Sequence, residues 1–542
     1  MTALEYNPLD PRVRNDPYPY YAALRRDAPV YRVPGLGLWA VSRHEDVLTI
    51  LRRPDLFSQA AMGAAVRRGA DFAPAERQHE APDPNAASVI GSDPPEHTRL
   101  RNIVNRGFTP RRIAALEGRV REIASRLAER FISAGECDLV ADYAVPLPVT
   151  VIAELLGVDP DRQQDFKRWS DAMIRVAFDS PSEEEGAHIT QCLVEVNDYL
   201  ETVMAARREC PADDLVSTLV HAEAVDGTLT SDELKIFVFT LLAAGNVTTT
   251  NLVANASRAL VEHPAELAKV TGDPSLIPNL VEEALRYDAP VQLLLRTASR
   301  DVELAGVPIP AGSTVAPLFA SANRDERVFA EPDRFDVTRR PRDHVAFGHG
   351  IHFCLGAALA RLEARVAFET LLPRVRNPVL AEEQLTWVDS LIMRGPKRLG
   401  LRFEPMARAA YPHSTARAST DGNEAIIRRF IDAWSRLDPA ELAAYFSEDG
   451  VYHNVTMHPV TGRANIEQMI RTFTASWTAT RWELRNVLAA GNVVMAERID
   501  RTQAGGRSVD LPIVGVFELE RGEIKVWRDY FDLGTYLQAL SS

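Results

Sequence analysis

Hydrophobic positions recur with helical spacing along most of the first 404 residues of the chain. Long amphipathic segments alternate there with short strand-like runs, and prolines stand at many of the joins. One segment begins with a capping-box pattern at Thr230 and Glu233 and ends at His263, which precedes a proline. Because its middle is apolar on nearly every side, we expect this helix to cross the interior of a mainly helical domain.

The pattern changes after residue 404. Residues 405–421 have no apolar periodicity and are rich in small, polar and proline residues, so we expect a linker there. The residues beyond it, 422–542, are predicted to form a second and smaller domain.

This second domain is predicted to be α+β. A helical stripe comes first, a short helix follows Pro439, and strand-like runs complete the domain. The stripe consists of Ile427, Phe430, Ile431, Trp434 and Leu437. The strand-like runs are 451–455, 482–488, 493–500, 509–519 and 524–531, with Gly491 and Gly522 at the expected hairpin turns.

Composition and charge narrow the possible functions. Hydrophobic residues make up 46% of the chain and charged residues 25%, which is typical of globular proteins. The net charge of −14 argues against binding to nucleic acid or to an anionic membrane. The first thirty residues contain no apolar signal core or anchor, so we expect a cytoplasmic protein. The cysteines form no C-x-x-C pair, so neither a disulfide framework nor an iron–sulfur cluster is indicated; they are Cys137, Cys192, Cys210 and Cys354.

The clearest chemical motif is the loop FGHGIHFCLG, residues 347–356, which precedes a helical run. Its glycines permit close approach of the backbone to a planar ring, and Phe347 can shield the Cys354 sulfur. Amide hydrogens at the start of the following helix would temper the charge of a thiolate. Two other interpretations stay open at this point: a buried thiol in a glycine turn, or a zinc site formed by His344, His349, His352 and Cys354.

The loop resembles the cysteine-ligand loop of cytochromes P-450, F-x-x-G-x-H-x-C-x-G. Glu283 and Arg286 match the E-x-x-R pattern of that family and Arg334 matches its third member, although an isolated pair of this kind is more often a solvated ion pair. The resemblance covers residues 1–404. It implies the mainly α cytochrome P-450 fold and a haem b whose iron is bound by Cys354.

The same resemblance assigns residues to the rest of the haem site. Four side chains match the positions that bind the haem propionates: His97, Arg101, Arg296 and His352. Because the sequence contains no flavin or ferredoxin module, electrons from NAD(P)H are expected to arrive through a separate ferredoxin and ferredoxin reductase.

The long helix carries AGNVTT, residues 244–249, which resembles the oxygen-activation segment of the family. The resemblance gives Gly245 the role of loosening the helix and Thr248 that of relaying protons, while a local bond to the preceding turn is the alternative for Thr248. Val247 stands where the family usually has an acid. Asn246 or a substrate hydroxyl could compensate; otherwise peroxide-driven chemistry becomes an alternative.

Polar residues spaced two apart mark the small domain. Tyr452 with Asn454, and Arg498 with Asp500, lie on strand-like runs, so each pair can face one cavity together with Asp529. Two carboxylates around one arginine in an apolar pocket could take unequal pKa values and supply one base and one acid.

These residues resemble limonene-1,2-epoxide hydrolase, a cone-shaped member of the SnoaL and nuclear-transport-factor-2-like fold, in its Y-x-N, R-x-D and W-R-D-Y-F-D elements. The resemblance implies a curved mixed sheet with helices and often a homodimer. Tyr452, Asn454 and Asp529 would hold a water that Asp529 deprotonates. Asp500 would protonate the epoxide oxygen, and Arg498 would bridge the carboxylates.

Together the two resemblances predict a bifunctional enzyme. The large domain would epoxidise an alkene of a small, natural-product-like molecule, and the small domain would open the epoxide to a diol or a cyclic ether. The alternative is a hydroxylase, or a peroxide-using haem enzyme, whose small domain is a non-catalytic dimerisation or docking module.

Overall fold

The computed structural model describes most of the chain, and the structural statements below concern those residues: 5–59, 62, 87–159, 162, 165–166, 168–170, 172, 183–212, 214–222, 229–406, 413–454, 459–490, 492–504, 507–520 and 522–530. The chain forms two compact units, Met1–Ala407 and Arg408–Ser542. The division falls inside the segment 405–421, in which we expected a linker.

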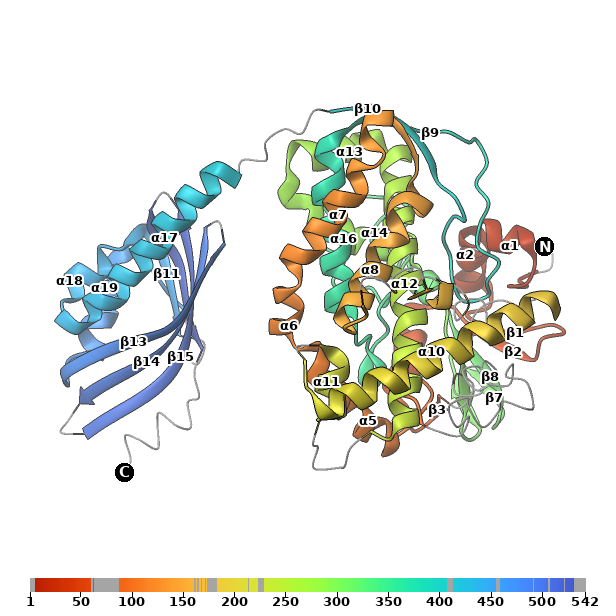
Figure 1. Cartoon of the computed structure of the whole chain (residues 1–542), viewed down its shortest axis with the longest axis horizontal. Coiled ribbons are helices and arrows are strands. Elements are labelled where there is room, and N and C mark those ends of the chain that lie inside the picture. Colours follow the sequence, from red (N-terminus) through yellow and green to blue (C-terminus); the bar gives the residue numbers. More distant parts are fainter. Residues whose placement is uncertain are drawn as a thin grey trace. The chain divides into compact units, whose positions relative to one another are not determined.

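The large unit is mainly helical (Figure 1). Its described α-helices are α1 (Pro11–Asn15), α2 (Tyr18–Asp27), α3 (His44–Arg52), α5 (Glu96–Val104), α6 (Pro110–Ala115), α7 (Glu117–Glu129), α8 (Pro146–Leu155), α10 (Glu183–Glu209), α11 (Leu215–Val220), α12 (Ser231–Glu262), α13 (Pro264–Gly272), α14 (Ile277–Tyr287), α15 (Phe319–Ala322) and α16 (Ala357–Leu371).

Helix α12 is the predicted interior helix. Thr230 caps it, because its hydroxyl accepts the Glu233 N–H at 3.1 Å and the Glu233 carboxylate accepts the Thr230 N–H at 2.8 Å. The helix packs against α8, α14 and α16 in the middle of the large unit (Figure 1). By length and composition alone it could also cross a membrane, but 61% of its apolar window is buried within the protein, as for a core helix.

Short strands form three sheets in the large unit. The largest has the order β1-β2-β8-β5-β3, the second β4-β10-β9, and β6 pairs with β7. The strands are β1 (Val30–Val33), β2 (Leu38–Val41), β3 (Phe57–Ser58), β4 (Glu136–Asp138), β5 (Arg296–Ala298), β6 (Val302–Leu304), β7 (Val307–Ile309), β8 (Thr314–Pro317), β9 (Val375–Leu380) and β10 (Gly400–Pro405).

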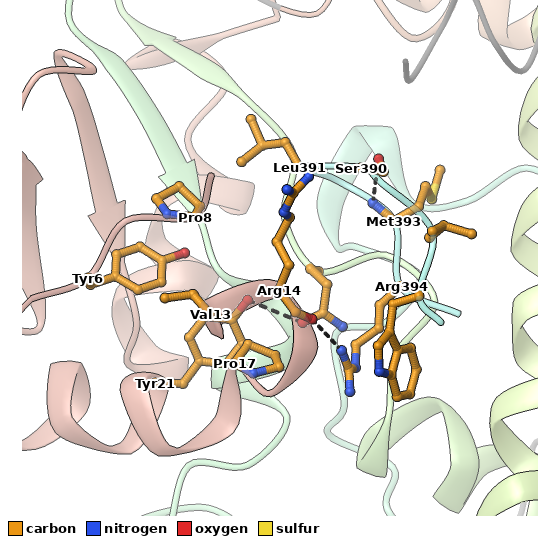
Figure 2. Close-up of a pocket in the computed structure, with 13 residues that line it drawn as sticks. Tyr6, Pro8, Val13, Arg14, Pro17, Tyr21, Ser390, Leu391, Met393 and Arg394 are labelled. Carbon is orange, nitrogen blue, oxygen red and sulfur yellow. Dashed lines mark hydrogen bonds between the residues drawn. The ribbon is translucent and has the colours of Figure 1, made fainter. Parts of the chain in front are cut away.

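Arg394 joins the start of the large unit to its later part. Its guanidinium donates to the carbonyls of Arg14 and Asn15 at 2.6 and 3.0 Å and pairs with buried Asp288 at 3.0 Å. A shallow pocket lies beside this junction, lined by Tyr6, Tyr21 and Met393 among others (Figure 2). None of the residues that we expected in the functional sites lines this pocket.

The small unit is a curved six-stranded sheet with helices on one face (Figure 1). The strand order is β12-β11-β16-β15-β14-β13; β11 and β16 are parallel, and the other neighbours are antiparallel. The elements are α17 (His413–Ala433), α18 (Pro439–Ala443), β11 (Phe446–Asn454), β12 (Val460–Thr461), α19 (Arg463–Phe473), β13 (Trp477–Ala490), β14 (Val493–Ala504), β15 (Arg507–Glu520) and β16 (Glu523–Tyr530).

Strand register brings the predicted polar residues of the small unit together. In the parallel pair β11–β16, Tyr452 lies beside Trp527 and Asn454 beside Asp529. Burial in β14 alternates, so Arg498 and Asp500 face inward on the same side. Beneath them lies an aromatic core that includes Phe430, Trp434, Phe446, Phe517 and Trp527.

Two features of the small unit differ from expectation. Helix α17 begins at His413, so residues 413–421 are helical rather than irregular; the run Ala416-Arg417-Ala418 in this segment favours a helix. Helix α19 was not expected, although Ile466 and Ile470 form its buried stripe. Gly491, Phe531 and Asp532, which belonged to predicted motifs, lie outside the described residues.

Candidate functional sites

The cysteine loop of the large unit is a tight turn at the start of α16. Gly350 has φ of +73°, and a Cβ there would lie 2.6 Å from the Leu51 carbonyl oxygen, so the turn requires glycine. The Cys354 N–H donates to the Phe347 carbonyl at 2.9 Å. Burial raises the pKa of the Cys354 thiol, whereas the N–H groups of Gly356 and Ala357 lower it, as expected of a sulfur at a helix start.

The described residues do not support the zinc alternative. Among them, no group of three or more His, Cys, Asp or Glu side chains could hold a metal ion. His344, one of the four proposed ligands, instead places its Nε2 atom 3.0 Å from a Glu282 carboxylate oxygen.

Four basic side chains gather around the cysteine loop, as the resemblance implied. The rings of His97 and His352 are 4.1 Å apart between centroids, and the charges of Arg101 and Arg296 act on His352. An Arg101 Nη2–H donates to the Phe353 carbonyl, next to Cys354, at 2.7 Å. The structure therefore brings together all five residues predicted for the haem site.

Little negative charge balances this cluster: the Asp93 carboxylate acts to raise the pKa of His97 and of Arg296, but it forms no ion pair with either side chain in the described structure. Within the described part of the chain, no ion pair joins Arg101 or Arg296 to a carboxylate, and the Nε2 atoms of His97 and His352 are buried without a hydrogen-bond partner. Burial lowers the pKa of Arg296 to about 10, and burial with neighbouring positive charge lowers that of His352 to about 3. Such a cluster fits a ligand that carries carboxylates, as a haem does.

The segment expected to activate oxygen lies on α12. The Thr248 hydroxyl donates to the Ala244 carbonyl at 2.7 Å, which is the local bond named as its alternative. The helix is continuous through Gly245, where we expected loosening; a Cβ there would meet Ile152 of α8 at 2.5 Å, so this glycine permits close helix packing. The Asn246 amide N–H is already engaged, because it donates to the Ser170 hydroxyl.

One buried acid near this segment was missed. Glu363 of α16 is 1% exposed, and burial raises its pKa to about 8, while a hydrogen bond with Thr249 of α12 acts in the opposite direction. Its position nine residues after Cys354 and its apolar neighbours in the sequence carry no signal that it contacts α12.

The E-x-x-R pair is structural, as expected, but it is not solvated. Glu283 and Arg286 are fully buried and share two bonds of 2.7 and 2.8 Å. The assignment of Arg334 as the third member is wrong for the side chain: Arg339 pairs with Glu283 at 3.3 Å, while Arg334 contributes only its carbonyl oxygen, which accepts from Arg286 at 3.1 Å.

In the small unit, Arg498 bridges two buried carboxylates. Its Nε and Nη2 atoms donate to the two oxygens of Asp500 at 2.9 and 3.2 Å. Its Nη1 and Nη2 atoms donate to Oδ1 and Oδ2 of Asp529 at 3.1 and 2.8 Å. Because Arg498 is fully buried and both acids are nearly so, little of this triad is exposed to bulk water.

The two carboxylates have different surroundings. Burial raises the pKa of Asp500 to about 7; Arg498 opposes this and the charge of Asp529 adds to it. Asp529 receives a further hydrogen bond, since the Trp527 indole N–H donates to its Oδ1 atom at 2.7 Å. Asp500 is therefore the carboxyl that can hold a proton near neutral pH.

Aromatic side chains and one glycine complete the site. The Tyr452 ring lies 4.2 Å from that of Trp527, and the Arg498 guanidinium lies 4.3 Å from the centre of the Trp482 ring. A Cβ on Gly515 would lie 2.5 Å from Arg498 Nη1 and 3.0 Å from Asp529 Oδ1. Sequence reasoning missed Gly515 and Trp482, and it included Trp527 only as a member of the W-R-D-Y-F-D element. The side chain of Asn454 lies outside the description.

Fold and site together define a thiolate-ligated haem enzyme joined to a domain with a buried acid–base triad. Family models agree: that of cytochrome P450 matches residues 274–402, and that of the limonene-1,2-epoxide hydrolase catalytic domain matches residues 422–542. The chain belongs to the cytochrome P450 family and carries a limonene-1,2-epoxide hydrolase-like domain at its C-terminal end.

Similar proteins cover nearly the whole of the large unit. Cytochrome P450 107B1 of Saccharopolyspora erythraea is 39% identical over 402 residues, 73% of this chain and 96% of the relative. The cytochrome P450 monooxygenase PikC of Streptomyces venezuelae is 40% identical over 398 residues, 72% and 91% of the two chains. The structure of CYP109Q5 from Chondromyces apiculatus matches with a TM-score of 0.66 at 39% identity, covering 74% and 99%.

Proposed function

We propose that this enzyme epoxidises an alkene of a small, natural-product-like substrate in its large unit and opens the epoxide in its small unit. The observation that carries the proposal is the buried triad of Arg498, Asp500 and Asp529, in which one carboxyl favours the protonated form. A chain that also carries the cysteine loop can thus supply the substrate of its own second site.

In the large unit, Cys354 would hold the haem iron, and His97, Arg101, Arg296 and His352 would bind the propionates. A bound haem supplies dioxygen activation: the alkene, O2, two electrons and two protons give the epoxide and water. The electrons would come from NAD(P)H through a ferredoxin and its reductase. Thr248 would pass protons by exchanging its bond to Ala244 for one toward the substrate side.

In the small unit, Asp529 would act as base and Asp500 as acid. Asp529 takes a proton from a water held with Tyr452 and Asn454, and the water oxygen attacks a ring carbon. The C–O bond of the epoxide breaks, and Asp500 donates its proton to the leaving oxygen. Arg498 keeps both carboxyl groups in place, and solvent then returns a proton from Asp529 to Asp500. If a substrate hydroxyl attacks instead of water, the product is a cyclic ether.

Oxygen isotopes test both steps on the full chain. With a reconstituted ferredoxin system, a panel of terpene and polyketide-like alkenes is turned over under ¹⁸O2 in ordinary water. We expect a diol with one ¹⁸O atom, and with Asp529→Asn we expect the singly labelled epoxide to accumulate. A cyclic ether whose oxygens include none from water would indicate capture by a substrate hydroxyl.

Other outcomes favour the alternatives. An unchanged product in Asp529→Asn would make the small unit a docking or dimerisation module on a lone monooxygenase. Turnover with hydrogen peroxide but not with the ferredoxin system would favour a peroxide-using enzyme, consistent with Val247 in place of an acid.

We also infer a cytoplasmic homodimer that pairs through the small unit. The outer face of its sheet exposes apolar side chains on neighbouring strands, namely Leu488, Met495, Val514 and Tyr530. The same strands carry both positive and negative side chains, in the ion pairs of Arg501 with Glu483 and of Arg528 with Glu518. A surface with charges of both signs can be complementary to a second copy of itself. Light scattering of the wild type should give a mass twice that of one chain, and Met495→Glu should give the mass of a single chain. A monomeric wild type would contradict the inference.

A further inference from the structure

Three tryptophans of the small unit share one aromatic cluster but use their indole N–H groups differently. The rings of Trp434 and Trp482 stack at 4.0 Å, and that of Trp527 lies 5.9 and 6.1 Å from them. The buried N–H groups of Trp434 and Trp482 have no hydrogen-bond partner within the described structure. The N–H of Trp527, in contrast, donates to Asp529 at 2.7 Å.

This bond makes the two oxygens of Asp529 unequal. Oδ1 accepts from Trp527 at 2.7 Å and from Arg498 Nη1 at 3.1 Å, whereas Oδ2 accepts, among the described side chains, from Arg498 Nη2 alone at 2.8 Å. A carboxylate oxygen offers about two lone-pair directions, so Oδ1 is saturated and Oδ2 retains one. A water proton can therefore be accepted at Oδ2 without displacing a bond.

The donor is held firmly. Trp527 and Asp529 are two apart on β16 and face the same side of the sheet. The Trp527 ring stacks on Phe517 with an interplanar angle of 13° and packs edge-on against Phe430 at 5.2 Å. The Tyr452 ring of β11 also lies 4.2 Å from the Trp527 ring, so little rotation of the indole is possible.

We propose that Trp527 is a positioning residue for epoxide opening, fixing the Asp529 carboxylate so that Oδ2 is the atom that takes the proton from the attacking water. The proposal rests on the proposed epoxide-opening function. The other charged groups that face Asp529 are Arg498 and Asp500 of β14, while β15 presents Gly515 and β11 presents Tyr452. An N–H donor also favours the ionised form of a carboxylate, so its loss should alter the pH range of activity.

Kinetics of the full chain test this role. Trp527→Phe should lower kcat for epoxide opening about tenfold with little change in KM, and should move the acid limb of the pH profile to higher pH. Benzothienylalanine at position 527, which replaces only the N–H by sulfur, should do the same without disturbing packing. Trp434→Phe, which removes an N–H that has no partner, is the matched control. Equal effects of the two phenylalanine variants, or an unmoved pH profile with benzothienylalanine, would overturn the proposal.

A second measurement does not depend on turnover. In full-length protein with ¹⁵N-labelled indoles, the Trp527 N–H resonance should lie downfield and exchange slowly with solvent, and Asp529→Asn should move it upfield while leaving that of Trp434 in place. If the wild type opens no epoxide but shows this coupling, the proposed function fails and the positioning contact stands. A Trp527 resonance that does not respond to Asp529→Asn would remove the contact itself.

Discussion

The two sites of this chain treat buried positive charge in opposite ways. Around Cys354, Arg296 is buried and Arg101 is half-buried, and no described carboxylate forms an ion pair with either, although Asp93 acts on Arg296 from a greater distance. In the small unit, Arg498 is also buried but donates four hydrogen bonds to Asp500 and Asp529. The positive charge of the first site is fully compensated only when an anionic cofactor binds, whereas the chain itself supplies the carboxylates that compensate Arg498 in the second site.

The difference teaches how each kind of site can be recognised. A buried cation costs free energy unless an opposite charge compensates it. Unpaired buried cations therefore point to a missing ligand, and here they fit haem carboxylates. A cation shared by two acids points instead to a preformed acid–base device, because the arginine holds two carboxyl groups together and burial raises the pKa of one of them, Asp500.

The largest effect is expected for Asp529, the proposed base of the site in the small unit. Asp529→Asn should reduce epoxide opening by about 10²–10⁴-fold, the usual contribution of general acid–base catalysis, and leave the haem absorption spectrum unchanged. Asp510→Asn, on the exposed side of β15, is the control and should keep wild-type activity. Consumption of a reactive epoxide followed by chromatography measures both, and comparable rates in wild type and Asp529→Asn would refute the assignment.

The comparison predicts stability changes of opposite sign for two similar substitutions. Arg498→Met should destabilise the small unit by about 3–5 kcal/mol, because two buried carboxylates lose their counter-charge. Arg296→Met should stabilise the haem-free large unit by about 1–2 kcal/mol and weaken haem retention, because it removes a buried cation whose desolvation outweighs the attraction of Asp93, with which it forms no ion pair. Calorimetry on haem-free and haem-loaded protein measures both; destabilisation of the haem-free form by Arg296→Met would break the comparison.

A smaller effect is expected where the triad is most crowded. A Cβ at position 515 would lie 2.5 Å from Arg498 Nη1, 2.8 Å from Phe517 and 3.0 Å from Asp529. Gly515→Ala should therefore cost about 1–3 kcal/mol of stability and about tenfold in epoxide opening, as the guanidinium shifts. Gly422→Ala, with open space around its Cβ, should not destabilise. Urea titration distinguishes them, and an unaffected Gly515→Ala would show that the guanidinium adapts freely.

The sequence was informative where chemistry depends on residues close together in the chain. The Cys354 loop, the capped helix α12 and the paired positions on β14 were all predicted from spacing, because period-two alternation places Arg498 and Asp500 on one face. The register between strands β11 and β16 could not be predicted from the sequence, because the two strands are far apart in the chain. This register places Tyr452 beside Trp527.

Contacts between distant segments escaped prediction for the same reason. Arg339 rather than Arg334 reaches Glu283 because the loop after α15 folds back on α14, and Glu363 meets Thr249 because α16 packs on α12. Gly515 reads as an ordinary glycine of a strand until β14 and β16 bring Arg498 and Asp529 over it. Helix α19 was missed because its hydrophobic stripe consists of only two buried residues among the eleven of the helix.

The site of the small unit should also respond to pH in a way that follows from Asp500. Burial raises the pKa of Asp500 to about 7, and the acid must be protonated to donate to the epoxide oxygen. As pH rises through 7 the protonated fraction falls, so kcat/KM for epoxide opening should decrease about tenfold per pH unit at higher pH. The sign follows from the role: a carboxyl acting as base would instead gain activity over the same range. Rates measured across this range on purified epoxide, bypassing the haem step, decide between them, and a flat profile to pH 9 would remove Asp500 as the acid.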